Sequence, residues 1–386
     1  MDGHDFPPWP SNRKCAVARN PFCQAAGCSP KIISVRSCRG RPHCGRKTIE
    51  GEKMMFKRRS LLAVISGVTL AASVLSAVPA TAATAAETDS LVGSAALVRD
   101  GKTGAQRQAS GEEAQRIVDD YWTPSRLASA IPVVAPAGTT DKELPAVTAK
   151  AVTASDPAAP AAGDKTTQDA WFSYTNGKIY FLDPRDNKNY MCSGSALNSG
   201  SKRLVVTAGH CSIVGGGNGQ VMLNWVFIPG YDHGSQPRGR FSAYWFHYST
   251  GWSVRNDWQR DFAFVVTNTN SSGQRVVDAA GGHGFRVNGS YSRFVHIAGY
   301  PGDRDSGEVQ WYCWGTTDRW PSANAYRLGC NFGGGSSGGP WLEDYQSNGL
   351  GYVISAMQGN LNGNNSGPYY DNHVLDVFNA AKDHTP

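Results

Sequence analysis

The feature that most constrains the fold is a series of short β-rich runs from about residue 168 to the C-terminus. Clusters of Gly, Asn, Ser and Asp, which are typical of tight turns, separate these runs. The ten clearest runs are 178–182, 191–197, 203–208, 221–228, 241–248, 261–267, 293–298, 308–314, 326–330 and 350–357. Short strands at this spacing predict an all-β sandwich or a pair of barrels, and about 220 residues are enough for two small cores.

Helical patterns are rare. Residues 373–382 have apolar side chains on one side and predict a short C-terminal helix. Upstream, residues 112–122 predict a second helix, and Pro124 ends it. One face of that second helix is apolar and consists of Ala114, Ile117, Val118 and Tyr121. Residues 132–163 are rich in Ala, Pro, Thr and Val, a composition that favours a linker over a core.

The N-terminal part contains an export signal. Residues 54–59 include three basic side chains, residues 61–78 are mostly apolar, and small-x-small cleavage signals follow at 80–85. This order predicts a signal peptide over 54–86 and a secreted, extracellular protein. Because such signals begin a chain, we interpret residues 1–53 as an extension from a start codon assigned too far upstream. A separate cysteine-containing domain is the alternative.

The charge distribution argues against two classes of partner. Residues 1–53 carry 10 Lys and Arg against 4 Asp and Glu, which accounts for the whole net charge of +6. Residues 166–386 carry 16 of each sign. A neutral folded part gives no general attraction to nucleic acid or to anionic membranes, so we expect neither partner after signal removal. We expect no metal or cofactor, because no His or carboxylate cluster has convincing ligand spacing. We also expect a monomer.

Four cysteines follow residue 53, namely Cys192, Cys211, Cys313 and Cys330. An even number in an exported chain suggests two disulfide bonds. Three pairings are compatible with four cysteines, and local pairing of 192 with 211 and of 313 with 330 is the simplest.

Three motifs carry candidate chemistry. His210 lies in Thr207-Ala208-Gly209-His210-Cys211, Asp261 opens an apolar run, and Ser337 lies in a glycine-rich turn over 334–340. A serine hydroxyl needs a nearby base to become a nucleophile, and histidine, with a free pKa near 6.5, is suited to that role. A carboxylate can hold the histidine tautomer. The pattern therefore predicts acyl transfer with Ser337 as nucleophile, His210 as base and Asp261 as orienting group.

These motifs resemble those of the chymotrypsin-like serine proteases, and more narrowly of the V8-like (glutamyl endopeptidase-like) bacterial branch. Gly299-Tyr300-Pro301-Gly302-Asp303 is similar to a segment typical of that branch. The resemblance covers residues 168–386. It implies two six-stranded antiparallel β-barrels with a short C-terminal helix, and a serine endopeptidase for protein or peptide substrates. Asp261 matches the family's aspartate better than Asp257, because it directly precedes the apolar run.

The resemblance also implies roles for other residues. The backbone N–H groups of Gly335 and Ser337 would form the oxyanion hole, and a Cys192–Cys211 bond would brace the loop of His210. Independently of the resemblance, a short amphipathic helix and an Ala/Pro-rich linker between the signal and the enzyme predict that residues 87–167 are a propeptide, which could inhibit the enzyme intramolecularly. A disordered stalk that the enzyme keeps is the alternative for this region.

Departures from the family concern activation and specificity. Trypsin has an aspartate just before the nucleophile that pairs with the freed N-terminus, whereas this chain has Ser336. Glutamyl enzymes carry a small hydroxyl residue where Phe332 stands, and a histidine on the strand matching 353–358, which has none. We therefore expect an apolar or aromatic substrate pocket, with Phe332, Ser355 and Met357 as candidate substrate-binding residues.

Two rival functions remain from the sequence. Gly335 to Gly339 also fits the Gly-x-Ser-x-Gly pattern of α/β-hydrolases, which would make the protein a secreted serine esterase. That fold places most of an α/β sheet before the serine, whereas here the preceding region is β-rich. The other rival is a catalytically silent secreted binding protein on a protease fold.

Overall fold

The computed structural model describes residues 16–18, 89–135, 149–161 and 172–386. The predicted signal peptide over 54–86 and, apart from strand β1 (Ala16–Ala18), residues 1–53 lie outside this range. In the ranges that are described, no helix is long and apolar enough to cross a bilayer.

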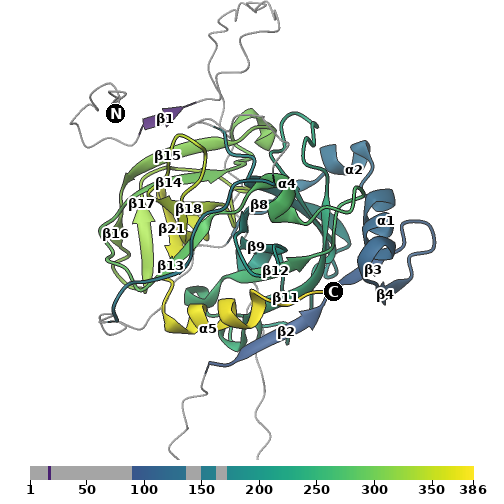
Figure 1. The fold of residues 1–386 in the computed structure, drawn as a ribbon, viewed down its shortest axis with the longest axis horizontal. Coiled ribbons are helices and arrows are strands. Elements are labelled where there is room, and N and C mark those ends of the chain that lie inside the picture. Colours follow the sequence, from purple (N-terminus) through teal and green to yellow (C-terminus); the bar gives the residue numbers. More distant parts are fainter. Residues whose placement is uncertain (1–15, 19–88, 136–148, 162–171) are drawn as a thin grey trace, which may run out of the picture. The chain divides into compact units, whose positions relative to one another are not determined.

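Six antiparallel strands close into a first barrel (Figure 1). Their order is β10-β7-β8-β9-β12-β11, and pairing of β11 with β10 closes the ring. The strands are β7 (Asn176–Asp183), β8 (Lys188–Leu197), β9 (Leu204–Thr207), β10 (Leu223–Pro229), β11 (Phe241–Ser249) and β12 (Ala263–Thr267). Their apolar side chains are almost entirely buried, which explains the near-continuous apolar character of these runs in the sequence.

The second half is built from two sheets, ordered β1-β15-β14-β18-β19-β13-β6 and β16-β17-β21-β20. Its strands are β13 (Gly284–Val287), β14 (Phe294–Gly299), β15 (Trp311–Thr316), β16 (Asp318–Arg319), β17 (Ala325–Leu328), β18 (Pro340–Glu343), β19 (Tyr352–Ala356), β20 (Gly359–Leu361) and β21 (Asn364–Pro368).

The all-β prediction is confirmed, and each of the ten predicted runs overlaps a strand. Among the described strands only two ladders are parallel, β13–β19 and β5–β8. An α/β-hydrolase needs a mainly parallel sheet flanked by helices, so that rival interpretation is wrong.

Helices are few and short. The predicted C-terminal helix is α5 (Asn372–Ala381), which begins where the Asp371 side chain accepts a hydrogen bond from Val374 N–H. Four further short elements lie within the protease-like region: α3 (Thr250–Ser253), α4 (Val276–Ala280), and single 3₁₀ turns at Gly209–Cys211 and Trp258–Arg260. A third 3₁₀ turn spans Asp305–Gly307. None is long enough to produce a helical period in the sequence, so none was predicted.

The predicted propeptide contributes folded elements of its own. They are β2 (Leu91–Ala95), β3 (Leu97–Arg99), β4 (Gln106–Gln108), α1 (Gly111–Tyr121), α2 (Pro124–Ala128), β5 (Ile131–Pro132) and β6 (Val152–Ser155). The predicted apolar face of α1 is buried, in one cluster with side chains of β7 and β10. Trp122 is 1% exposed and its indole N–H donates to Asn224 O at 2.7 Å. Figure 1 shows α1, β3 and β4 together beside the first barrel.

Part of the predicted linker is also structured. Val152–Ser155 forms β6, which adds antiparallel to the edge strand β13. The sequence interpretation of 132–163 as a linker throughout therefore does not hold at these four residues. Their pairing partner lies more than a hundred residues away, so composition alone could not reveal it.

Candidate active site

His210 and Asp261 form a close pair at the edge of the first barrel. His210 Nδ1 lies 2.8 Å from Asp261 Oδ2, and His210 N–H donates to Asp261 Oδ1, also at 2.8 Å. The Asp261 side chain is fully buried, and that of His210 is 10% exposed. With both carboxylate oxygens accepting from His210, the ring is held with its Nδ1 protonated and its Nε2 facing away from the carboxylate.

Short turns position these two groups. His210 lies in the 3₁₀ turn that follows β9, and Asp261 follows the 3₁₀ turn Trp258–Arg260 just before β12. β9 and β12 are neighbours in the barrel, which brings the two turns together. Asp257, the rival to Asp261, instead caps that second turn, where its side chain accepts from Gln259 N–H.

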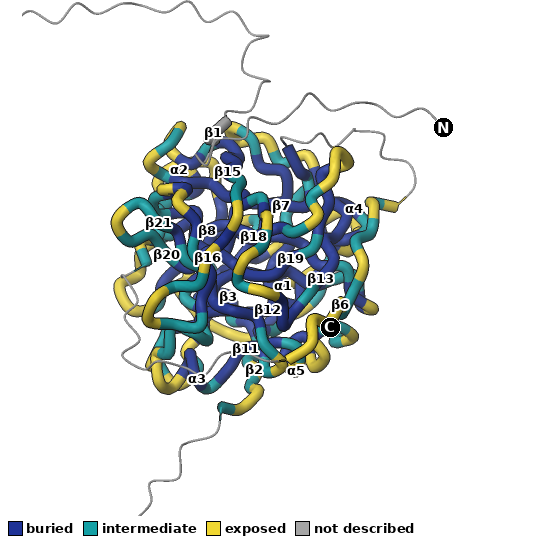
Figure 2. Tube along the Cα trace, turned by 90° about the vertical axis from the view of Figure 1, so that its left-hand side faces the viewer, coloured by how far each residue is buried: buried dark blue, intermediate teal, exposed yellow. Residues whose placement is uncertain are grey.

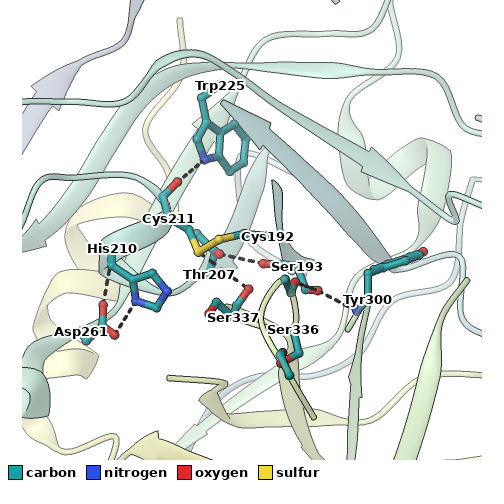
Figure 3. The surroundings of a disulfide bond; sticks show 12 residues. Cys192, Ser193, Thr207, His210, Cys211, Trp225, Asp261, Tyr300, Ser336 and Ser337 are labelled. Atoms are coloured by element: carbon teal, nitrogen blue, oxygen red, sulfur yellow. Dashed lines mark hydrogen bonds and ion pairs between the residues drawn. A yellow bond between two sulfur atoms is a disulfide. The ribbon is translucent and has the colours of Figure 1, made fainter. Parts of the chain in front are cut away.

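Ser337 lies on the same side of the ring as the free nitrogen (Figure 3). In that view the imidazole of His210 stands between Asp261 and Ser337. His210 Nε2 is buried and has no hydrogen-bond partner among the described residues. Ser337 is 3% exposed. An unpartnered basic nitrogen next to a serine is the arrangement that activates a hydroxyl nucleophile once substrate is bound.

The loop of Ser337 is fixed to β8 and β9 by backbone contacts. Ser337 O accepts from Ser193 N–H at 2.7 Å, and Thr207 Oγ1 donates to Ser193 O at 2.8 Å (Figure 3). Gly338 has a φ of +80°, and a Cβ there would lie 2.0 Å from Thr207 Oγ1. Only glycine allows this approach, so the turn brings the serine onto the strand that leads to His210.

Both disulfide bonds of the local pairing are formed. Cys192 of β8 bonds to Cys211, the neighbour of His210, and Cys313 bonds to Cys330. Cys211 O also accepts from the Trp225 indole N–H at 3.0 Å. The loop that carries His210 is therefore tied covalently to β8 and by a hydrogen bond to β10. Cys192, His210 and Cys211 lie close enough to suggest a metal site, but the two sulfur atoms are bonded to each other.

The backbone at Gly335, a predicted oxyanion donor, has a left-handed conformation. Gly335 has a φ of +87°, and its O accepts from Ser193 Oγ at 2.8 Å. Its N–H points away from this contact and donates to Val133 O of the predicted propeptide at 2.8 Å. Ser336 Oγ donates to Gly333 O at 2.6 Å, a bond within the turn itself.

The three candidate substrate-binding residues are fully buried. Phe332 and Met357 belong to the apolar core of the second half, and Ser355 Oγ donates to Pro368 O. The Arg304 guanidinium lies 4.8 Å from the centre of the Phe332 ring. A cavity of about 260 Å³ next to His210 has other walls: Val133, Val134, Phe181, Asp183, Arg185, Asp186, Tyr190 and Met222.

Aromatic and buried groups surround the pair. The Trp258 and Trp252 rings lie 6.0 and 6.4 Å from the His210 ring. Burial, together with the charge of Asp261, holds the pKa of Tyr370 well above its usual range, so this phenol stays neutral beside the carboxylate. On this side of the pair, buried apolar groups exclude water, which strengthens the electrostatic interaction between His210 and Asp261.

Sequence reasoning missed the residues that support the site. Ser193 and Met191 contact the serine loop and Gly335 from β8, and no sequence motif marks them; Thr207 lies in the histidine motif, but its contact with Ser193 O could not be read from it. It also missed Val133, whose carbonyl reaches the site from residue positions assigned to a linker.

The chain is similar to solved protease structures. No family model matches the chain, and no curated protein sequence does. Among solved structures, a protease named Anisep from Arthrobacter nicotinovorans is 32% identical, with a TM-score of 0.51. The match covers 57% of this chain and 100% of that one. A thermostable serine protease, AL20, from an extremophilic microorganism is 28% identical, with a TM-score of 0.52. Here 55% of this chain and 99% of that one are covered.

Proposed function

Because the chain belongs to the chymotrypsin-like serine proteases, we propose that it is an exported endopeptidase that cleaves peptide bonds through an acyl-enzyme on Ser337. The observation that carries the proposal is the His210–Asp261 pair with its unpartnered Nε2, next to a serine in a rigid glycine turn.

In the first half of the reaction, Ser337 Oγ attacks the substrate carbonyl carbon while His210 Nε2 accepts the hydroxyl proton. Asp261 stabilises the imidazolium that results and keeps its orientation. The carbonyl oxygen becomes an oxyanion, which accepts from the N–H groups of Gly335 and Ser337. Each such donor typically lowers the barrier by about 3–4 kcal/mol.

The intermediate then collapses. The carbon–nitrogen bond breaks, His210 passes its proton to the leaving amine, and the acyl group stays on Ser337 as an ester. Water attacks the ester carbonyl with His210 again as base, which releases the carboxylic acid and restores the serine hydroxyl. No step requires a group other than these residues and water.

The precursor organisation completes the proposal. A signal peptide over 54–86 directs export, and residues 87–167 are a propeptide that is removed, leaving a protease domain over 168–386. The two disulfide bonds suit an extracellular site of action. Substrates are proteins or peptides, and we propose an apolar or aromatic residue on the acyl side of the cleaved bond. Phe332 replaces the small hydroxyl residue of the glutamyl enzymes, and 353–358 lacks their histidine, so the groups that would pair with a substrate carboxylate are missing at these positions.

Labelling with a fluorophosphonate probe tests the proposal. The matured protein is expected to be labelled at Ser337. Ser337→Ala is expected to remain unlabelled, and His210→Ala to be labelled much more slowly than wild type. Absence of labelling in a folded, matured protein would favour a catalytically silent binding protein. Labelling that survives Ser337→Ala would show that another serine is the nucleophile.

A further inference from the structure

Residues 131–135 of the predicted propeptide lie in the candidate active site, and we call this segment the strap. β5, its first two residues, pairs in parallel with β8, where Pro132 is opposite Met191. Val133 N–H donates to Met191 O at 3.1 Å. Val133 and Val134 then form one wall of the cavity that contains His210. The strap therefore covers the groups proposed for catalysis.

The strap occupies one of the proposed oxyanion donors. Gly335 N–H donates to Val133 O at 2.8 Å. At the neighbouring Gly334, a Cβ would lie only 2.8 Å from the same oxygen, so a side chain there would crowd the strap. A substrate carbonyl needs this N–H to become an oxyanion, and it therefore competes with Val133 O for the same donor.

The direction of the strap follows from the two sides of the cleft. His210 must reach the leaving nitrogen, so the leaving-group side is the cavity next to His210, bounded by Phe181 and Tyr190. On its other side the serine loop borders β19, since Gly338 N–H donates to Met357 O at 2.7 Å, and we assign the acyl side to this border and to the adjoining β20. A substrate runs from its acyl part to its leaving group, and therefore from β20 toward β8.

The strap runs the other way. Ile131 is opposite Tyr190 on the leaving-group side. Four residues later, Ala135 Cβ lies 3.6 Å from where a Cβ of Gly359, the first residue of β20, would be. Val133, midway, places its carbonyl on Gly335 N–H. A substrate in the ordinary direction would pair antiparallel with β8, whereas the strap pairs parallel.

We propose that the strap is a built-in inhibitor that fills the cleft in the direction opposite to a substrate, with the Val133 carbonyl as a stand-in for the substrate carbonyl. This inference rests on the function proposed above. In the reversed direction, the Val134 nitrogen leads toward β20 and away from the leaving-group side. His210 is then poorly placed to protonate it, so the strap blocks the site and is not cleaved there.

Backbone contacts, more than side chains, hold the strap. The side chains of Ile131 and Val134 are 41% and 78% exposed. The folded part of the propeptide keeps the strap close to the site, because Leu127 of α2 and Trp122 are buried in the cluster shared with the first barrel. Arg240 Nη1 adds a bond to Trp122 O at 2.9 Å. A short tether of this kind gives the strap a high effective concentration at the cleft.

The first test compares rates of fluorophosphonate labelling at Ser337 in the full-length precursor and in the matured protein. We expect the wild-type precursor to react at least roughly tenfold more slowly than the matured protein. Tenfold is the factor that corresponds to one hydrogen bond of about 1.4 kcal/mol. Val133→Pro removes the N–H donated to Met191 and is expected to restore the matured rate. Val152→Ala, at an exposed position of β6 outside the strap, is the matched control and is expected to leave the precursor rate unchanged. A precursor without residues 131–135 serves as a second variant should Val133→Pro fold poorly.

The outcomes separate the two proposals. A matured protein that reacts while its precursor reacts equally fast overturns the strap proposal and leaves the protease proposal intact. Slow labelling that persists both in Val133→Pro and in the precursor without residues 131–135 also overturns it. A matured protein that does not react overturns the protease proposal, and the strap proposal with it.

The second test addresses direction. The precursor is incubated with a small amount of matured protein, and the new chain ends are identified by mass spectrometry. We expect cleavage to leave residues 131–135 intact. A new N-terminus at Val134 would show that the strap binds as a substrate and would overturn the reversed direction.

Discussion

Asp261→Asn provides the sharpest test of the proposed triad, because the two side chains have nearly the same shape but differ in hydrogen bonding. The carboxylate accepts two N–H groups of His210 at 2.8 Å, one from the backbone and one from the ring. An amide accepts with its oxygen only and presents its NH₂ to the other donor. The backbone N–H cannot lose its hydrogen, whereas the ring can change tautomer. The amide oxygen is therefore expected to face the backbone, and the NH₂ to face Nδ1.

The consequence is a proton on the wrong ring nitrogen. With Nδ1 as acceptor, Nε2 carries the hydrogen and cannot accept the proton of Ser337. Loss of the correct tautomer in a Ser-His-Asp triad costs roughly 10⁴-fold in kcat. At about 1.4 kcal/mol per factor of ten, this is about 5.5 kcal/mol of transition-state stabilisation. The fold should change little, because the substitution keeps the volume of a side chain that is fully buried.

The assay is the fluorophosphonate labelling rate and peptide hydrolysis of the matured protein, with near-UV circular dichroism to verify folding. Asp257→Asn is the matched control, since this side chain caps a 3₁₀ turn and does not contact His210. We expect its rate to stay within about threefold of wild type, because removal of a cap affects stability by only about 1 kcal/mol. An Asp261→Asn protein within tenfold of wild type, or a larger loss in Asp257→Asn, would refute the assignment.

Three further predictions concern stability. Trp122→Ala should lower the free energy of unfolding of the precursor by about 3–5 kcal/mol, measured with urea, because it empties a buried site and removes an indole hydrogen bond. Replacing both cysteines of the 192–211 bond by Ala should lower the free energy of unfolding by about 3 kcal/mol and also slow labelling of Ser337. The same replacement at the 313–330 bond should lower the free energy of unfolding by a similar amount but affect labelling less. Equal effects of the two replacements on labelling would contradict the bracing role of the 192–211 bond. Burial lowers the pKa of His283 to about 3, below its unfolded value near 6.5, so this group's contribution is complete above pH 6.5 and is lost as pH falls toward 3. The loss is roughly 5 kcal/mol, and urea unfolding at several pH values should show a flatter profile in His283→Gln.

The strands of the two cores could be predicted from the sequence because each has its own local signal. β-branched and aromatic residues between glycine and asparagine turns mark β7 to β12, and burial of these side chains in the barrel confirms that pattern (Figure 2). The amphipathic face of α1 is equally local, since its four apolar positions recur at helical spacing and all are buried.

Other elements depend on partners far away in the chain. β6 exists because β13 has a free edge. β5 exists because β9 pairs only with Ser195–Leu197 of β8, which leaves that side of β8 open at Tyr190 and Met191. Short segments such as Ile131–Pro132 have no periodicity of their own, and their prolines favoured a linker. The candidate triad could be identified from motifs, yet the contacts that orient it, such as Thr207 Oγ1 with Ser193 O, arise from strand pairing that no motif encodes.

The position of Ser336 suggests how the precursor becomes active. In trypsin the residue before the nucleophile is an aspartate that pairs with the freed N-terminus on activation. Here Ser336 Oγ is bonded within its own turn, to Gly333 O, and Gly335 N–H already points into the cleft, toward Val133 O. Under the proposed mechanism, removal of the strap alone would free the Gly335 N–H, with no rearrangement of the serine loop. We therefore expect Val133→Pro to activate a precursor whose chain is still uncut, whereas a mechanism of the trypsin kind would require cleavage before any activity appears. Activity of the uncut variant, measured with its intact mass in the same sample, distinguishes the two.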